Sequence, residues 1–203
     1  MAREFLRTLL TPAVRAAQRR YYGRAYPELG ATSESEPMTP EAIEFVRARD
    51  SFYLATISEN GWPYNQHRGG PVGFVTAPSP SQLAFADYGG NRQLISVGSL
   101  GENPRVCLFL MDYPARTRLK VLGLAEVLDA REHAELVASL APPGGHAAPV
   151  ERIVRVQVQS YDWNCPKFIT PRFTSEEVEA VVGPMRARIA ELEEKLAGKR
   201  GAD

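Results

Sequence analysis

The chain has 203 residues, and its 24 lysines and arginines balance its 24 aspartates and glutamates, so the formal net charge is zero. A neutral chain lacks the broad positive field that draws nucleic acid or an anionic membrane surface, which argues against both partners. No apolar run approaches the roughly 20 residues needed to span a bilayer, and the length suits one well-packed domain.

The N-terminal segment, residues 1–38, predicts a basic amphipathic helix over residues 1–20, followed by a linker. Arg15, Arg19 and Arg20 would lie on its polar side, and the helix would dock on the domain or on a partner subunit. Charges interrupt its apolar residues, whereas a secretory signal needs about 7–15 unbroken apolar residues. The segment is therefore not expected to be a secretory signal.

A short helix follows the linker. Thr39 is a predicted N-cap, Pro40 occupies the first helical position, and apolar residues carry the helix to about Arg49. From Ser51 onward the chain consists of short β-rich runs. The predicted strands cover residues 52–58, 62–68, 73–76, 82–87, 105–111, 119–129 and 153–160, with a helix over residues 131–140. Six or seven short strands with hairpin signals predict an antiparallel barrel.

The tail, residues 174–203, predicts an amphipathic helix. Thr174 and Glu177 form a capping-box pattern that opens it. The apolar residues Met185, Ile189, Leu192 and Leu196 then follow coiled-coil spacing, as expected for docking on the barrel or on a second subunit. Gly183-Pro184 is expected to break or kink the helix before that seam.

Two strand-like runs look like neighbours, and each ends in glycine and arginine. They end in residues 66–71 and 84–92. Arg68 and Arg92 are candidates for phosphate contacts, because arginine makes forked, charge-assisted bonds to phosphate. The Gly89-Gly90 turn can offer backbone N–H groups, and Asn91 can cap a helix over residues 91–97 whose N-terminus would face the same anion. Surface ion pairs are the competing interpretation of both arginines.

Several other residues keep more than one interpretation. Asp87 can accept a bond from a ring N–H or be an ordinary turn aspartate, and His67 can contact a ligand or bond a backbone carbonyl. Trp163 can stack over a ring, form a subunit contact or pack in the core. No base adjoins Cys165, so it is not expected to be a nucleophile.

The cysteines and histidines indicate neither a disulfide framework nor a metal site. Cys107 and Cys165 are the only cysteines, which leaves a reducing, cytoplasmic setting as the default, and Cys107 sits in an apolar run typical of a small buried residue. No pair of the three histidines has metal-ligand spacing.

Several motifs in fixed order resemble the pyridoxamine 5′-phosphate oxidase-related FMN-binding proteins, in the branch with His-Arg-Gly-Gly-Pro and Trp-Asn-Cys-Pro signatures. They are His67–Pro71, Phe85–Arg92, Asn103–Val106, Arg118–Glu126 and Trp163–Pro166. The resemblance runs from about residue 45 to 174. It implies a mainly β fold, a six-stranded antiparallel split β-barrel with N- and C-terminal helices. The FMN-binding domain would cover residues 39–173, in a homodimer with FMN at the subunit interface.

Carried over by position, the resemblance also implies a set of cofactor-binding residues. They are Gln66, His67, Arg68, Gly69, Ala86, Asp87, Asn91, Arg92, Arg118 and Trp163. Gln93 falls where the oxidase has lysine, and the chain lacks the Arg-x-His-type segment with which the oxidases grip their substrate. Vitamin B6 oxidation is therefore not expected, whereas FMN binding is.

Three functions follow as hypotheses. The first is an FMN-dependent oxidoreductase acting on a small molecule, in which chemistry takes place on the flavin and no side chain is a catalytic nucleophile. The second is a non-catalytic FMN-binding module serving as store, sensor or electron relay. The third keeps the fold and replaces FMN with a deazaflavin or haem.

Overall fold

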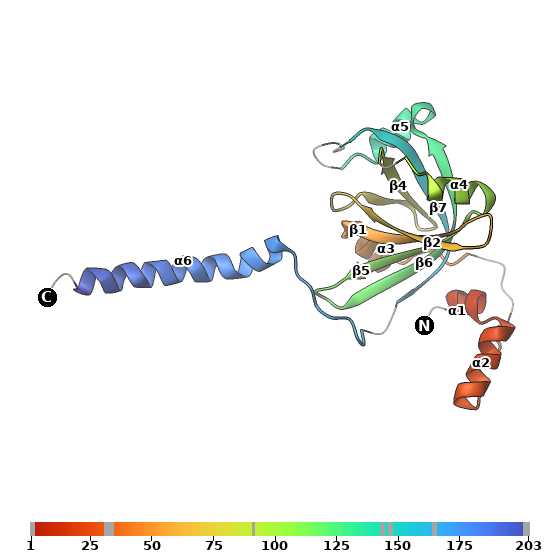
Figure 1. The fold of residues 1–203 in the computed structure, drawn as a ribbon, viewed down its shortest axis with the longest axis horizontal. Coiled ribbons are helices and arrows are strands. Elements are labelled where there is room, and N and C mark those ends of the chain that lie inside the picture. The colour runs from red at the N-terminus through yellow and green to blue at the C-terminus, as the bar shows by residue number, and fades with distance from the viewer. Residues whose placement is uncertain are drawn as a thin grey trace. The chain divides into compact units, whose positions relative to one another are not determined.

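The computed structural model describes residues 3–30, 35–90, 92–142, 145, 148–163 and 166–200. They form two compact units (Figure 1). The larger unit covers Met1–Asp112 and Thr117–Pro166, and the smaller covers Tyr113–Arg116 and Lys167–Asp203. The larger unit contains the β-sheet, and the smaller contains the C-terminal helix.

Two helices occupy the N-terminal segment, so the prediction of a single helix was wrong. Helix α1 spans Arg3–Leu9 and α2 spans Pro12–Tyr22. Pro12 separates them, because the residue before a proline is pushed out of the helical conformation. Thr11 instead caps α2, its hydroxyl accepting a bond from the backbone N of Val14 at 3.3 Å. Phe5 of α1 is buried, which attaches α1 to the larger unit.

The sheet has seven antiparallel strands in the order β2-β1-β5-β6-β7-β4-β3. Their bounds are β1 Ser51–Ile57, β2 Pro63–Gly69, β3 Val75–Ser79, β4 Gln82–Tyr88, β5 Arg105–Asp112, β6 Thr117–Asp129 and β7 Val150–Trp163. Within the described residues β2 and β3 are its two edges, so the sheet is not closed by hydrogen bonds. This is the expected class of mainly antiparallel, split-barrel fold, with seven strands where the resemblance implied six.

Alternate residues of the strands turn toward one core, and most of these inward residues are apolar. In β1, for example, Phe52, Leu54 and Thr56 are buried while their neighbours are not. The Phe52 ring stacks on Phe74 with 5.8 Å between centroids and meets Phe85 edge-on at 5.1 Å. These rings connect β1 with β4, which is possible only because the sheet curls around the core.

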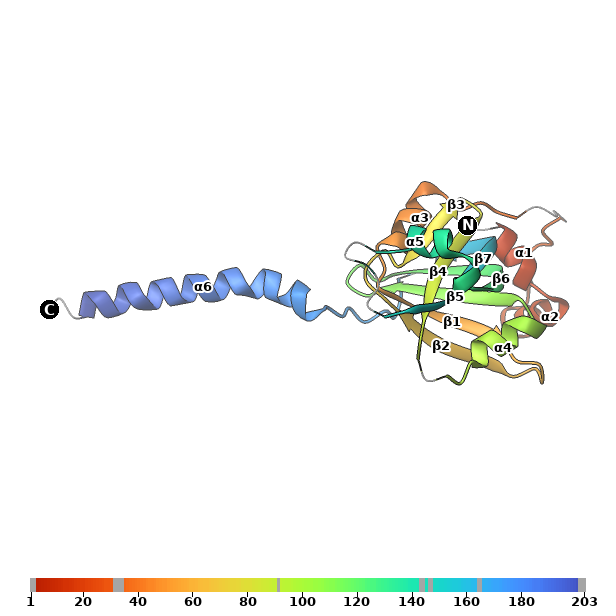
Figure 2. The same ribbon diagram turned by 90° about the horizontal axis from the view of Figure 1, so that it is seen from above.

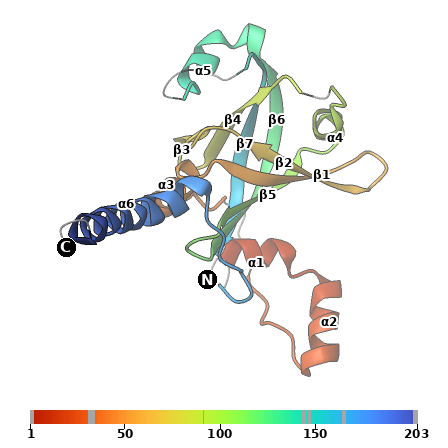
Figure 3. The ribbon, with the colours of Figure 1, turned by 60° about the vertical axis from the view of Figure 1, so that its left-hand side comes forward.

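Helix α3 (Pro40–Arg47) begins where the sequence predicted, with the Thr39 hydroxyl accepting a bond from the backbone N of Ala42 at 3.4 Å. The other short helices lie around the sheet (Figures 2 and 3). Helix α4 (Ile95–Glu102) lies beside β2, while η1 (Ala130–Glu132) and α5 (Ala134–Ser139) stand near the start of β7. The predicted helix over residues 91–97 was therefore wrong in position, since α4 begins at Ile95.

Helix α6 (Ser175–Arg200) belongs to the smaller unit. Its capping box is confirmed: Thr174 N donates to Glu177 Oε2 at 2.8 Å, and Glu177 N donates to Thr174 Oγ1 at 3.1 Å. The helix is continuous through Gly183 and Pro184, so the predicted break does not occur. None of the described helices is both long and apolar enough to cross a membrane.

Candidate functional site

A cavity of about 140 Å³ opens between β2, the end of β4, the start of β7 and the N-terminus of α4. Its lining is strongly polar. The lining residues are Tyr64, Gln66, Arg68, Asp87, Tyr88, Gly90, Arg92, Gln93, Leu94, Ile95, Ser96, Val97 and Arg152. The cavity therefore joins the two glycine- and arginine-containing runs singled out in the sequence.

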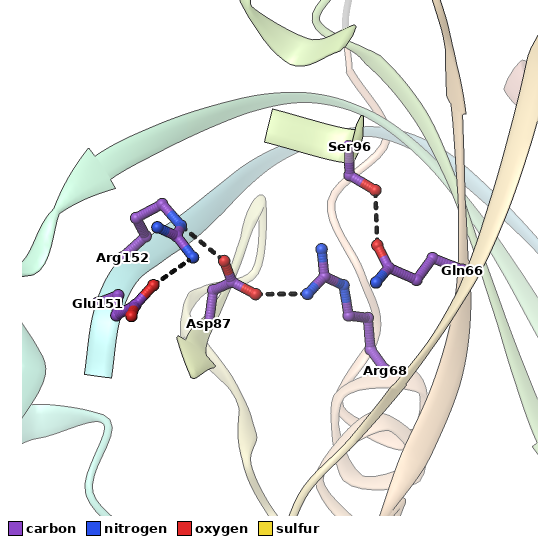
Figure 4. A network of polar contacts seen from close by, with 6 residues as sticks. All are labelled: Gln66, Arg68, Asp87, Ser96, Glu151 and Arg152. Carbon is purple, nitrogen blue, oxygen red and sulfur yellow. Dashed lines mark hydrogen bonds and ion pairs between the residues drawn. The ribbon is translucent and has the colours of Figure 1, made fainter. Parts of the chain in front are cut away.

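The two runs meet although their strands are not hydrogen-bonded neighbours. In the sheet order, β1, β5, β6 and β7 lie between β2 and β4, so the expectation of neighbouring strands was wrong. The curl of the open sheet brings β2 back toward β4, and an ion pair between Arg68 and Asp87 spans the gap (Figure 4). The cavity lies where the barrel is split.

The alternation of β2 decides which of its side chains reach the cavity. Tyr64, Gln66 and Arg68 are half-buried and line it, whereas His67 is exposed on the other face of the strand. Gln66 is fixed there by the buried Ser96 of α4, whose hydroxyl donates to Gln66 Oε1 at 2.9 Å (Figure 4). Alternate side chains of β2 therefore face the cavity and the opposite side of the sheet.

Asp87 is the electrostatic centre of the site. Its side chain is only 5 % exposed, and its two oxygens bond two different arginines. Oδ1 accepts from Arg68, and Oδ2 accepts from Arg152 Nε at 2.8 Å. Arg152 stands directly opposite Asp87 in the pairing of β7 with β4, so the strand register fixes this contact. Neither interpretation of Asp87 from the sequence included an ion pair with two arginines.

The cavity is positively charged even with Asp87 included. Three arginines and one aspartate line it, a formal net charge of +2. Burial acts to lower the pKa of Arg152, but hydrogen bonds and charge from Asp87, and then from Glu151, outweigh it, so the pKa is raised. The Arg152 guanidinium therefore remains charged at physiological pH.

The segment between β4 and α4 adds backbone groups to this positive site. Arg92 and Leu94 both have left-handed backbone conformations, with φ of 60° and 53°, which are uncommon outside glycine. Such strained residues cluster at ligand sites. Leu94 is the N-cap of α4, and its side chain makes no cap bond. The first residues of the helix, 95–97, line the cavity. An uncapped helix N-terminus attracts an anion.

Arg68 retains donors that the described residues do not satisfy. Its only bond within that part of the chain uses Nη1, and its Nε is buried without a partner. A buried unsatisfied donor costs about 1–3 kcal/mol, so a ligand acceptor that satisfies it gains affinity. Arg92 is exposed and lines the cavity. The donor set of guanidinium and backbone N–H groups fits a phosphate.

Not every residue implied by the resemblance lies in this cavity. Gln66, Arg68, Asp87 and Arg92 do, and Asn91 falls outside the described residues. The remaining five lie elsewhere: His67, Gly69, Ala86, Arg118 and Trp163.

His67 and Arg118 share the outer face of the sheet. Tyr53 pairs with His67 on one neighbouring strand and with Phe109 on the other, so the three side chains lie on one face. Arg118 pairs with Met111, two residues after Phe109, and therefore lies on the same face. The guanidinium of Arg118 lies 5.9 Å from the Phe109 ring centre, with its Nε buried and without a partner in the described residues. Both side chains therefore face away from the cavity.

Trp163 lies at the end of β7 opposite to Arg152. Its ring meets Phe45 of α3 edge-on at 4.9 Å, and 39 % of the residue is exposed. It therefore contacts the domain's own helix and remains partly exposed, and ring stacking stays a prediction. Asn164 and Cys165, which complete its motif, lie outside the described residues.

Sequence reasoning missed Arg152, Ser96 and Tyr64. Arg152 precedes the alternating run of β7 as an ordinary polar residue, and only the strand register assigns it to Asp87. Tyr64 could have been predicted, because it is two residues before Gln66 and so faces the same side of β2 as Gln66 and Arg68. Among the described residues no group of three histidine, cysteine or acidic side chains is arranged to hold a metal ion.

Solved structures with a similar chain fold share little sequence with this protein. A candidate pyridoxamine 5′-phosphate oxidase from Lactobacillus delbrueckii is 21 % identical, with a TM-score of 0.49 over 62 % of this chain and 93 % of the other. A pyridoxinephosphate oxidase family protein from Clostridium acetobutylicum, related to a general stress protein, is 18 % identical, with a TM-score of 0.45 over 61 % and 85 %. An FMN-binding protein from Syntrophomonas wolfei is 13 % identical, with a TM-score of 0.45 over 62 % and 87 %.

No curated protein matches the sequence. The family model described as pyridoxamine 5′-phosphate oxidase, by contrast, matches residues 38–163, which is more than half of the chain and includes the whole sheet and the cavity. The chain belongs to the pyridoxamine 5′-phosphate oxidase family.

Proposed function

We propose that this protein is an FMN-dependent oxidoreductase acting on a small molecule, with the phosphate of FMN held in the cavity at the split of the barrel. The observation that carries the proposal is the cavity itself. Arg68, Arg92 and Arg152 converge there, next to the uncapped N-terminus of α4. This arrangement suits a dianionic group on a small ligand.

Each group of the site has a distinct task in this proposal. Arg68 and Arg92 contact the phosphate, because both line the cavity and have guanidinium donors that the described residues leave unused. Asp87 holds Arg68 and Arg152 in place, and the Ser96–Gln66 bond fixes an amide at the same wall. When bound, FMN supplies hydride transfer, while the protein supplies binding and orientation.

The size of the cavity indicates that one subunit does not enclose the cofactor. Ligand pockets usually have about 300–1,000 Å³, well above the volume here. The cavity suits the phosphate-bearing end, and the rest of FMN has to extend beyond it. A second subunit is the natural cover for that part, and we include a homodimer in the proposal.

The outer face of the sheet supports this homodimer. Strand pairing puts Tyr53, Ile57 and Leu124 on that face, 37–41 % exposed, with the partly buried Phe109 beside Tyr53. An apolar face of this kind is typical of a protein interface. His67 and Arg118 lie on the same face, so in a dimer they are available to the other subunit's cofactor. A cation near the flavin ring would stabilise its anionic reduced form.

The visible absorption spectrum of the purified protein tests the proposal. We expect a yellow protein with a flavin spectrum that bleaches when a nicotinamide donor is added and returns in air. Stable FMN binding without faster reduction than free FMN would support the non-catalytic module instead. A deazaflavin or haem spectrum would replace FMN, and a colourless protein that does not take up FMN would refute the proposal.

A further inference from the structure

Helix α6 carries an apolar stripe that the cofactor site does not use. The stripe, here called the seam, has apolar residues at alternating spacings of four and three: Val178, Val182, Met185, Ile189, Leu192 and Leu196. Ile189 is 56 % exposed and Leu196 is 60 % exposed, values far above those of a core position. The spacing is that of a and d positions in a heptad repeat, with Val182 at an a position.

A helix of this composition is not expected to persist uncovered in water. Gly183 and Pro184 both weaken its middle, since glycine is flexible and proline lacks a helical N–H. Isolated helices are marginal even with good helix formers, and most gain their stability from packing an apolar face. In heptad terms Gly183 and Pro184 are at b and c positions, away from the seam. The seam is therefore the face that a partner can cover without meeting them.

We propose that the seam of α6 pairs with the same seam of a second copy of this chain, in a parallel two-stranded coiled coil. The identity of the seam residues is the first reason. Two of the three a positions carry the β-branched Val182 and Ile189, and the third carries Leu196. The d positions carry Val178, Met185 and Leu192. β-Branched residues at a with leucine at d favour two parallel strands.

The charges beside the seam give the second reason, because they distinguish the two orientations. In a parallel pair the g position of one helix faces the e position five residues later in the other. Arg188 then meets Glu193 of the partner subunit, and the symmetric contact repeats it. The g-position Lys195 would face a like charge only at the last e position of the helix.

An antiparallel pair with the same seam residues in contact would bring like charges together. Arg186 would face Arg186 of the partner subunit, Arg188 would face Arg188 of the partner subunit, and Glu179 would face Glu193 of the partner subunit. Repulsive contacts of this kind select against an alternative pairing even where each attractive pair contributes little. The charge pattern therefore selects a second parallel copy over an antiparallel one.

Cysteine cross-linking in the full-length chain tests this pairing. In a background with Cys107→Ala and Cys165→Ser, Leu192→Cys places a thiol at a d position, which a parallel pair brings next to its own copy. Glu194→Cys is the matched control on the opposite side of the helix. We expect mild oxidation at tens of micromolar chain to link most of the Leu192→Cys protein and less than about a tenth of the control. Equal linking of the two variants, or none, would overturn the proposal.

Three further substitutions separate seam pairing from chance collision and from the antiparallel arrangement. Adding Ile189→Asp to Leu192→Cys should reduce linking to the control level, whereas adding Ala190→Asp, off the seam, should not. Persistent linking with Ile189→Asp would overturn the proposal. Mixing a tagged Val182→Cys chain with an untagged Leu192→Cys chain should give no disulfide-linked mixed dimer, since these two positions face each other only in an antiparallel pair. The outcome does not depend on a bound flavin, so it stands apart from the test of function.

Discussion

Replacing Asp87 with asparagine should destabilise the protein more than an isosteric change usually does. The carboxylate is 5 % exposed, and its partners Arg68 and Arg152 are 17 % and 20 % exposed. Asparagine keeps the shape, but it removes the charge that compensates two guanidinium groups. Removing one partner of a buried ion pair costs about 3–5 kcal/mol. Because water reaches part of both arginines, we expect a loss of about 2–4 kcal/mol here.

Urea unfolding followed by far-ultraviolet circular dichroism and tryptophan fluorescence measures this loss. With a denaturant slope of about 2 kcal/mol/M, a loss of about 3 kcal/mol lowers the midpoint by about 1.5 M. Asp129→Asn is the matched control, because Asp129 also pairs with an arginine, Arg131, whose side chain is 88 % exposed. Asp129 also caps η1, with Oδ1 accepting a bond from the backbone N of Arg131 at 2.9 Å, and asparagine caps as well as aspartate. The control's unfolding midpoint should therefore change far less. Equal losses for the two variants would show that Asp87 is not a buried electrostatic centre.

Three further predictions concern other parts of the larger unit. Gly70→Ala should lower stability by about 1–3 kcal/mol in thermal melting, because a Cβ there would lie 2.6 Å from the Phe74 ring, while Gly101→Ala, with open space around it, should not. Ser96→Ala should cost about 1 kcal/mol in urea unfolding and weaken FMN binding severalfold, and unchanged binding would remove Ser96 from the site. Burial raises the pKa of the Cys107 thiol, so it keeps its proton to higher pH than in the unfolded chain. Alkylation of its peptide near pH 9, followed by mass spectrometry, should be slower in folded than in unfolded protein, and equal rates would contradict this.

Much of the fold could be predicted because local patterns decide it. The strand over residues 52–58, the Thr39 cap and the Thr174–Glu177 capping box each depend on residues a few positions apart, and each is found in the structure, the strand within one residue of its predicted bounds. Predictions failed where a single proline or a tertiary environment decided. Pro12 divides the N-terminal helix, whereas Pro184 does not end α6.

The site could be predicted only in part, for a related reason. The periodicity of two indicates that Gln66 and Arg68 share a face of β2, and the glycines mark the end of β4. Strand register and the curl of the sheet depend on contacts between distant segments, which one sequence does not contain. For this reason the pairing of Asp87 with Arg152, and the four strands that separate β2 from β4 in the sheet order, became visible only in three dimensions.

The ratio of FMN to riboflavin affinity tests the central claim most directly, because the two ligands differ only in the phosphate. Titration followed by quenching of flavin fluorescence should give FMN at least about 100-fold tighter binding, as two charge-assisted contacts imply. In Arg92→Met, which breaks no ion pair among the described residues, FMN should bind about 10-fold or more weaker while riboflavin is unchanged. Equal affinity for both flavins in the unmodified protein, or an Arg92→Met change that weakens both alike, would contradict a phosphate site in this cavity.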